Sequence, residues 1–214
     1  LKELPLKSVD AGAGLDRFAV ILQGVDSVYE TDLLFPIVEV FAPKDNQESK
    51  SVRIITDHLR CATFMIADGI YPANTSREYV VRQLIRRALL HARLTEKDPE
   101  SFIRASKVVI ELFSPYYPEL TRSQAMVEMA IRRETATFGK TLNRGLKELE
   151  KVFSRSLGII SGADAFKLYE TYGFPLELTK EIAVEKSLKV DEEGYQYQFE
   201  EHRKLSRQAK GGVQ

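Results

Sequence analysis

Apolar residues recur every three or four positions along most of the chain, a spacing that places them on one face of a helix. This pattern predicts helices at residues 15–22, 32–41, 52–66, 77–94, 102–113, 123–153, 163–171, 176–185 and 195–209. Only residues 3–9 have the loose alternation and β-type side chains of a strand. The fold is therefore expected to be mainly α, with about one strand near the N-terminus.

Glycines and polar runs mark the ends and weak points of these helices. Gly69 follows the helix at 52–66, at a position where glycine commonly ends a helix. The polar run at 43–50 is the clearest linker in the chain. Gly139 and Gly145 lie inside the longest helix, and each is expected to weaken it by about 1 kcal/mol relative to alanine.

Composition narrows the class of protein. The chain has 214 residues, of which 43% are hydrophobic, enough to bury a core and to exclude a wholly disordered tail. Its 31 basic and 31 acidic residues cancel, so any nucleic-acid-binding surface must be local. The single cysteine excludes a disulfide framework, and no apolar run approaches the length of a membrane span. With no signal-peptide pattern at its start, the chain is expected to be a soluble cytoplasmic protein.

A glycine-rich turn at residues 10–17 (DAGAGLDR) is the first candidate for chemistry. A strand that ends in such a turn and opens a helix brings backbone N–H groups close to a ligand. Arg17, one turn into that helix, can hold a phosphate or stack on a flat ring, and Asp10 can receive an amine. The plainer interpretation is a tight turn in which Arg17 pairs with Asp16 or Asp10, and the pattern by itself favours it.

The helix at 77–94 is rich in arginine and is the second candidate. Arg82, Arg86 and Arg93 fall along one stripe beside its apolar face, and the helix also carries Arg77, Arg87 and His91. Such a stripe can follow a phosphate backbone, because arginine makes bidentate contacts with phosphate. The alternative is a solvated helix face whose acidic neighbours come from elsewhere in the fold.

Polar side chains at loop and helix ends form a third group. Asn74 follows a proline in a loop, and Glu170 precedes a turn. Amide and carboxylate groups can read base edges, but Asn74 can equally belong to a turn and Glu170 to the surface. His58 and Cys61 lie three apart on one helix, yet a zinc site needs about four ligands. A buried cysteine, a hydrogen-bonded histidine and no metal site are expected.

Several of these motifs together resemble one family. The segment 10–18 (DAGAGLDRF), followed by LQG at 22–24 and YETD at 29–32, resembles motif 3 of the alanyl-tRNA synthetases and its sequel. The family's tRNA-recognition region is resembled by a further set of segments, in matching order: DH at 57–58, IADG at 66–69, PAN at 72–74, YVVRQLIRR at 79–87, FGKTL at 138–142, GL at 145–146, AFKLY at 165–169 and TYGFP at 171–175. The resemblance covers nearly the whole chain.

This resemblance implies a class II enzyme that activates alanine with ATP and magnesium and esterifies it to the 3′ end of its tRNA. Asp10 would take the α-ammonium group of alanine, and Gly12 and Gly14 would let the backbone pass close to the substrate. Arg17 would be the motif 3 arginine that contacts ATP. The expected partners are alanine, ATP and the acceptor stem of tRNA-Ala, with no membrane.

In the region that reads the acceptor stem, Asn74 matches the asparagine that the family assigns to a G·U wobble pair. Glu170 lies where the family usually has an aspartate. Arg82, Arg86 and Arg87 match the family's basic helix and would hold phosphates of the stem. Gln83 replaces a common arginine, and Glu78 replaces a common glycine.

The resemblance also implies a division of the chain. Residues 1–26 would end a class II catalytic domain as a remnant strand, turn and helix, and residues 27–214 would form a helical tRNA-recognition domain. Nothing in the sequence resembles the family's motifs 1 and 2, and the first residue is not methionine. The chain is therefore expected to be an inactive fragment that binds no ATP alone. The alternative is a stand-alone, non-catalytic RNA-binding module from the same family.

Overall fold

The computed structural model describes residues 8–9, 11–41 and 50–211. In this part of the chain the fold is mainly α, as the hydrophobic pattern predicts. The elements, in order, are α1 (Leu15–Gln23), the 3₁₀ helix η1 (Val28–Glu30), α2 (Phe35–Phe41), α3 (Lys50–Ala67), α4 (Ser76–Leu94), α5 (Glu100–Phe113), α6 (Glu119–Arg155), β1 (Ile159–Ile160), α7 (Gly162–Tyr172), α8 (Leu176–Glu185), β2 (Lys189–Val190) and α9 (Glu192–Gly211). None of the described helices is both long and apolar enough to cross a bilayer.

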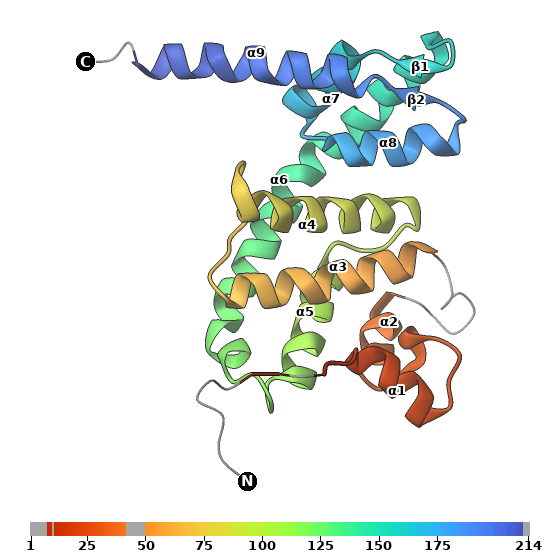
Figure 1. Cartoon of the computed structure of the whole chain (residues 1–214), viewed down its shortest axis with the longest axis vertical. Helices are drawn as coiled ribbons and strands as arrows, with labels where there is room; N and C mark the ends of the chain where they lie inside the picture. The colour runs from red at the N-terminus through yellow and green to blue at the C-terminus, as the bar shows by residue number, and fades with distance from the viewer. Residues whose placement is uncertain (1–7, 10, 42–49, 212–214) are drawn as a thin grey trace.

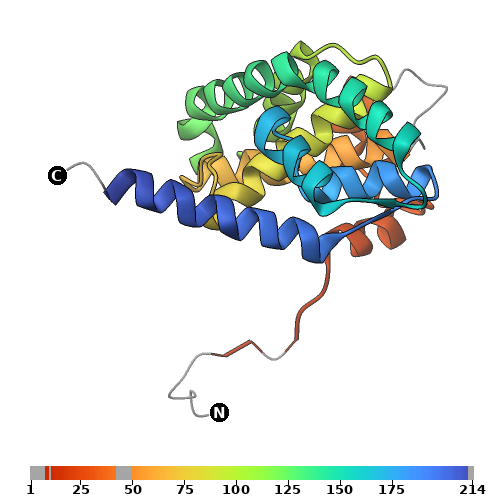
Figure 2. The same ribbon diagram turned by 90° about the horizontal axis from the view of Figure 1, so that it is seen from above.

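Helices α3 and α4 lie side by side in the middle of the molecule, and the long helix α6 runs across them (Figure 1). Helices α1, α2 and α5 occupy one end, whereas α7, α8, α9 and the two strands occupy the other. Seen from above, α9 projects beyond the other helices toward the C-terminus (Figure 2). The 37-residue helix α6 thus connects the two ends of the fold.

Two hydrophobic cores hold these helices together. The larger core collects the inward faces of α2 to α8, and its fully buried side chains include Phe41, Ile55, Leu59, Ile85, Phe102, Phe138 and Phe174. The smaller core, built around Phe166 and Tyr195, joins the end of α6 to α7, α8 and α9. Burial of these apolar faces removes their area from water, which is the main favourable contribution to folding.

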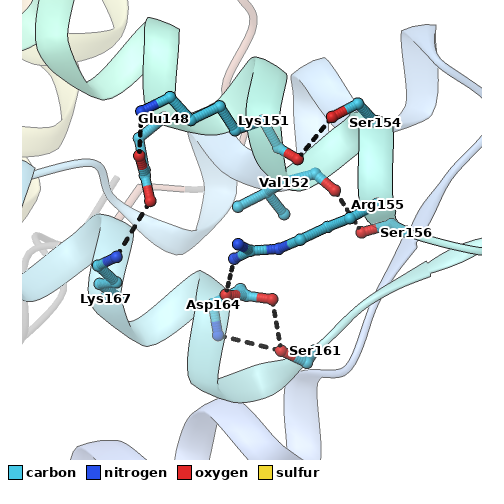
Figure 3. Close-up of polar contacts among 9 residues, drawn as sticks. All are labelled: Glu148, Lys151, Val152, Ser154, Arg155, Ser156, Ser161, Asp164 and Lys167. Atoms are coloured by element: carbon cyan, nitrogen blue, oxygen red, sulfur yellow. Dashed lines mark hydrogen bonds and ion pairs between the residues drawn. The ribbon is translucent and has the colours of Figure 1, made fainter.

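Helix α6 is tied to α7 by polar contacts at the corner where the chain turns (Figure 3). Glu148 of α6 accepts a hydrogen bond from Lys167 of α7 at 3.0 Å, and Arg155 pairs with Asp164. The hydroxyl of Ser161 caps α7 by accepting a hydrogen bond from the Asp164 backbone N–H at 3.1 Å. This corner fixes the direction of α7 relative to α6.

Two short strands were not expected from the sequence. Strand β1 pairs with β2 in parallel, with Ile159 opposite Lys189 and Ile160 opposite Val190. Each strand has only two residues, so alternation has no length over which to appear in the sequence. The strand expected at residues 3–9 lies mostly outside the described residues, and Ser8 and Val9 form no strand.

Three further expectations have different outcomes. The helix expected from residue 32 begins instead at Phe35, because Thr31 first opens a turn whose carbonyl accepts hydrogen bonds from Leu34 and Phe35. The linker at 43–50 lies outside the described residues except for Lys50, which starts α3. Gly69 follows α3 with a φ of 83°, in the left-handed conformation expected of a helix-ending glycine.

Gly145 has a packing role that Gly139 lacks, and the weakening of α6 expected at both positions stays a prediction. A Cβ atom at Gly145 would lie 2.4 Å from the ring of Phe174, whereas one at Gly139 would meet no atom within 4 Å. The absence of a side chain at Gly145 therefore lets the turn after α7 approach α6 closely. Phe174 packs edge-on against Phe138 of α6, with ring centroids 5.6 Å apart.

Candidate RNA-recognition site

The glycine-rich turn at the N-terminal end carries an exposed arginine. Gly14 is the N-cap of α1, and the side chain of Arg17 folds back toward it. Asp16 accepts hydrogen bonds from both Nη atoms of Arg60, at 3.1 and 3.0 Å, so its partner is Arg60 and not Arg17. Gly12 is exposed as well, and Asp10 lies outside the described residues.

Asn74 lies on the exposed loop that leads into α4. Its amide oxygen accepts a hydrogen bond from Nη1 of Arg82, and Nη2 of Arg82 also reaches the carbonyl of Pro72 at 3.5 Å. A guanidinium group has donors only, so it must face the amide oxygen and leave the amide NH₂ on the other side. Arg82 therefore fixes which way the Asn74 amide points.

Two of the three arginines of the predicted stripe, Arg82 and Arg86, meet one buried carboxylate from α6. Glu134 is 4% exposed, and its Oε1 lies 2.7 Å from Nε of Arg86 and 3.4 Å from Nε of Arg82. The contact with Arg86 is a hydrogen bond, whereas Nε of Arg82 makes an ion pair without one. Arg86 also donates to the carbonyl of Gly173 at 2.6 Å. The acidic neighbours that the sequence left open are thus present in the fold.

Arg87 points to a different acidic partner, on α8. Its guanidinium group binds the carboxylate of Glu181 through two hydrogen bonds, and Nη1 donates to Nε2 of His58 at 3.1 Å. These contacts with Arg87 lower the pKa of Glu181 to about 2. Burial, and the charge of Arg87, lower the pKa of His58 to about 4. Phosphate contacts by Arg82, Arg86 and Arg87 therefore stay a prediction, since all three already have partners inside the protein.

Glu170 lies near the end of α7, about half exposed, and pairs with His202 of α9 at 3.1 Å. Its neighbour Tyr169 lines an open pocket of about 530 Å³ that Asn74 also lines. The structure thus brings the loop of Asn74 and the α7 segment of Glu170 to one pocket. Glu170 itself is not among the lining residues.

The pocket has an aromatic floor, formed by Tyr79, Tyr169, Tyr195 and Phe199. The ring of Tyr169 lies 6.0 Å from that of Tyr195 and 5.6 Å from that of Phe199, measured between centroids. Burial is the main cause that raises the pKa of Tyr79 to about 12, so its hydroxyl stays protonated and can donate a hydrogen bond. The pocket therefore combines flat apolar rings with polar groups, a composition that suits nucleotides.

Helix α9 supplies a wall of this pocket, which the sequence analysis missed. Gln196 and Arg203 of α9 line it, and among the described residues no ion pair of Arg203 is found. The signal that was available is the spacing of Tyr195 and Phe199, four residues apart and thus on one helix face. In a helix otherwise dominated by charge, this pair marks the inward side.

His58 and Cys61, the two residues considered for a metal pair, lie on α3 in different surroundings. His58 accepts a hydrogen bond from Arg87, as a hydrogen-bonded histidine was predicted to do. Cys61 is exposed, which corrects the expectation of a buried cysteine, because it lies on the side of α3 opposite the buried Leu59. In the part of the chain that the structure describes, no three histidine, cysteine or carboxylate residues gather in a way that would hold a metal.

The sequence that builds this pocket is similar to that of known proteins. The model of the family "tRNA synthetases class II (A)" matches residues 1–214. The chain belongs to this family. The resemblance to alanyl-tRNA synthetases is confirmed by curated relatives named alanine–tRNA ligase.

Three of these relatives indicate how much of a longer enzyme the chain represents. It is 40% identical to the protein of Fervidobacterium nodosum and 40% identical to that of Thermotoga maritima, over the whole chain in each case. It is 42% identical to the protein of Synechocystis over 98% of the chain. The chain spans about a quarter of the length of these relatives, at 25%, 26% and 25% respectively.

Proposed function

We propose that this chain is part of an alanine–tRNA ligase and that its own role is to recognise the acceptor stem of tRNA-Ala. The observation that carries this proposal is the exposed amide of Asn74, fixed by Arg82 at the rim of an aromatic pocket. The relatives' name supports the choice of tRNA as the ligand. The whole enzyme would activate alanine with ATP and transfer it to the tRNA in the cytoplasm.

The geometry of Asn74 suits an RNA minor groove. A-form RNA presents base edges and 2′-hydroxyl groups in a wide, shallow minor groove, which a side chain on a protruding loop can reach. Because Arg82 engages the amide oxygen, the NH₂ group is the part of Asn74 that faces a ligand, and it can donate to base oxygens. Asn74 would therefore read the G·U pair, with Glu170 contacting the stem from the α7 side.

Positive charge near the pocket would hold the RNA backbone. Arg82 and Arg86 share one carboxylate, that of Glu134, so this group of three retains one excess positive charge. Arg87 is balanced by Glu181 and contributes less. Arg203 is exposed on the pocket wall and free of ion pairs in the described part of the chain, which makes it the strongest candidate for a phosphate contact.

The N-terminal turn would contribute to the alanine and ATP site of the whole enzyme. Gly12, Gly14 and Arg17 are exposed on one short segment, so a ligand can reach them, and a guanidinium group suits a nucleotide phosphate or base. Asp10 would bind the ammonium group of alanine. Magnesium would enter with ATP, and its ligands are not found as a cluster among the described residues.

Binding of two RNA hairpins tests this proposal. One hairpin carries a G·U pair in the acceptor stem and the other a G·C pair, and fluorescence anisotropy at one fixed salt concentration gives both dissociation constants. Asn74→Ala should shrink the preference for G·U by roughly 5- to 100-fold, because a base-edge contact contributes about 1–3 kcal/mol of discrimination. Glu170→Ala should act in the same direction more weakly.

A matched control comes from another exposed asparagine. Asn143 of α6 also accepts a hydrogen bond from an arginine, Arg93, at 3.0 Å, but it does not line the pocket. Asn143→Ala should leave the preference unchanged. Equal loss of affinity for both hairpins in Asn74→Ala would show that Asn74 only shapes its loop, and no preference in the unaltered chain would contradict the proposed function.

A further inference from the structure

One buried carboxylate lies behind both segments that the proposed function assigns to RNA recognition. Glu134, in the middle of α6, contacts Arg82 and Arg86, which are one helical turn apart on α4. Each arginine then extends to a different segment of the chain. The arrangement forms a fork with Glu134 at its base.

The first branch of the fork ends at Asn74. Arg82 is fixed at one end by the Oε1 atom of Glu134, 3.4 Å from its Nε, and its Nη1 donates to the amide oxygen of Asn74 at the other end. The side chain of Arg82 is only 19% exposed, so neighbouring residues restrict its choice of rotamer. The direction of the Asn74 amide therefore depends on a carboxylate that is almost fully buried.

The second branch ends at the turn that follows Glu170. Nε of Arg86 donates a hydrogen bond to Oε1 of Glu134 at 2.7 Å, and its Nη1 donates to the carbonyl of Gly173 at 2.6 Å. The guanidinium group also stacks over the ring of Phe138, 5.0 Å from its centroid. Gly173 ends α7 with a φ of 71°, a left-handed conformation that suits glycine. Glu170 precedes it by three residues, so the contact with Arg86 fixes the end of the helix that carries Glu170.

Glu134 is therefore more than a neutralising partner for two arginines. We infer that Glu134 is a positioning residue for RNA recognition, which sets the orientation of Asn74 through Arg82 and the position of the α7 end through Arg86. This inference rests on the proposed function of Asn74 and Glu170. Without the carboxylate, the two guanidinium groups would repel each other and Arg82 would lose its anchor, so the amide of Asn74 would sample other orientations.

Glu134→Gln is the variant that separates positioning from simple burial. Glutamine has nearly the same shape, and its amide oxygen can still accept a hydrogen bond from Nε of Arg86. The negative charge that holds Arg82 is lost, however. Glu150→Gln is the matched control, because Glu150 lies on the same helix but is exposed and without an ion pair among the described residues.

The first measurement needs no RNA. The side-chain amide NH₂ of Asn74 gives a pair of resonances in a ¹⁵N–¹H NMR spectrum, identified by their loss in Asn74→Ala. Glu134→Gln should shift and broaden this pair, since the amide gains orientational freedom, and Glu150→Gln should leave it unchanged. Identical Asn74 resonances in Glu134→Gln and the unaltered chain would overturn the inference, whatever the RNA experiments give.

The second measurement is the ratio of dissociation constants for the G·C and G·U hairpins. Glu134→Gln should lower this ratio by about 5- to 30-fold, the loss expected for one misdirected base-edge contact. Adding Asn74→Ala to Glu134→Gln should cause little further loss, because both changes remove the same contact. Independent, multiplicative losses in the double variant would overturn the inference.

Two controls keep the outcomes separable. If the unaltered chain shows no preference between the hairpins, the proposed function fails, and the Asn74 resonances alone decide the positioning role. If Glu134→Gln does not fold, Arg82→Lys tests the same branch, since lysine keeps the charge but cannot bridge Glu134 and Asn74 with two separate donor positions of a planar group. Arg82→Lys should lower the ratio of the two hairpin dissociation constants and shift the Asn74 resonances. The absence of either effect would contradict the inference.

Discussion

Arg87 of α4 holds Glu181 of α8 through two parallel hydrogen bonds, from Nε to Oε2 at 2.8 Å and from Nη2 to Oε1 at 3.0 Å. The two residues are 94 positions apart in the sequence, so the pair connects elements that meet only in the folded chain. A bidentate, partly buried pair of this kind constrains orientation as well as charge. Removing either partner should therefore affect stability more than removing a surface charge does.

Glu181→Gln should destabilise the protein by about 1–3 kcal/mol, because it leaves the half-buried guanidinium group of Arg87 without its charged partner. Urea unfolding measures the change. Glu185→Gln is the control on the same helix, since the Glu185 side chain is 57% exposed and lies 4.0 Å from Lys50. That substitution should cost less than about 0.5 kcal/mol. Equal losses in the two variants would assign no special role to the pair with Arg87.

Stability should fall as the pH is lowered from 6.5 toward 4, because His58 must be neutral in the folded protein. Burial and the charge of Arg87 lower the pKa of His58 from 6.5 to about 4, so the unfolded chain takes up a proton first and is favoured by acid. Glu181 adds a second loss below pH 4.5, since its folded pKa is about 2. Urea midpoints measured from pH 7.5 to 4 should show the first decline.

His58→Gln removes the titrating group but keeps an acceptor for Arg87. The decline between pH 6.5 and 4 should be smaller in this variant. A partial decline should persist, because burial also lowers the pKa of His91. A profile parallel to that of the unaltered protein would exclude His58 as a source of the acid sensitivity.

The two glycines of α6 should respond to alanine in opposite directions. Gly139→Ala should stabilise the protein by about 1 kcal/mol, because a Cβ atom meets nothing within 4 Å and alanine is the better helix former. Gly145→Ala should destabilise it by about 1–3 kcal/mol, since the new Cβ would overlap the ring of Phe174. Thermal unfolding of both variants and of the unaltered protein gives the sign of each stability change. The same sign for both would show that Phe174 can move away without cost.

Arg203→Ala should reduce the salt dependence of RNA binding. An exposed arginine that contacts one phosphate contributes about one unit to the slope of log affinity against log salt concentration. Arg122→Ala, which removes an exposed charge near the start of α6, should leave the slope unchanged. Titrations of the G·U hairpin at several salt concentrations give both slopes. Equal slopes for Arg203→Ala and the unaltered chain would place α9 away from the RNA backbone.

The hydrophobic spacing determined the helices, and the reason is local. Residues three and four apart share a helix face whatever surrounds them, so Ile55 and Leu59 mark the buried side of α3 from the sequence itself. The resemblance to the family could also be found from the sequence alone, because the family's motifs are short runs of neighbouring residues. The segment with Asn74 and the helix with Arg82 and Arg86 were found in this way.

The pairing of charges was decided only by the tertiary structure. Arg86 and Glu134 are 48 positions apart, and no periodicity connects them; they meet because α4 packs across α6. The sequence therefore predicted an arginine stripe and left acidic neighbours open as an alternative, but it did not identify Glu134 as the carboxylate that meets Arg82 and Arg86. The aromatic pocket was also decided by the tertiary structure. The rings of its floor come from α4, α7 and α9, which only helix packing brings together.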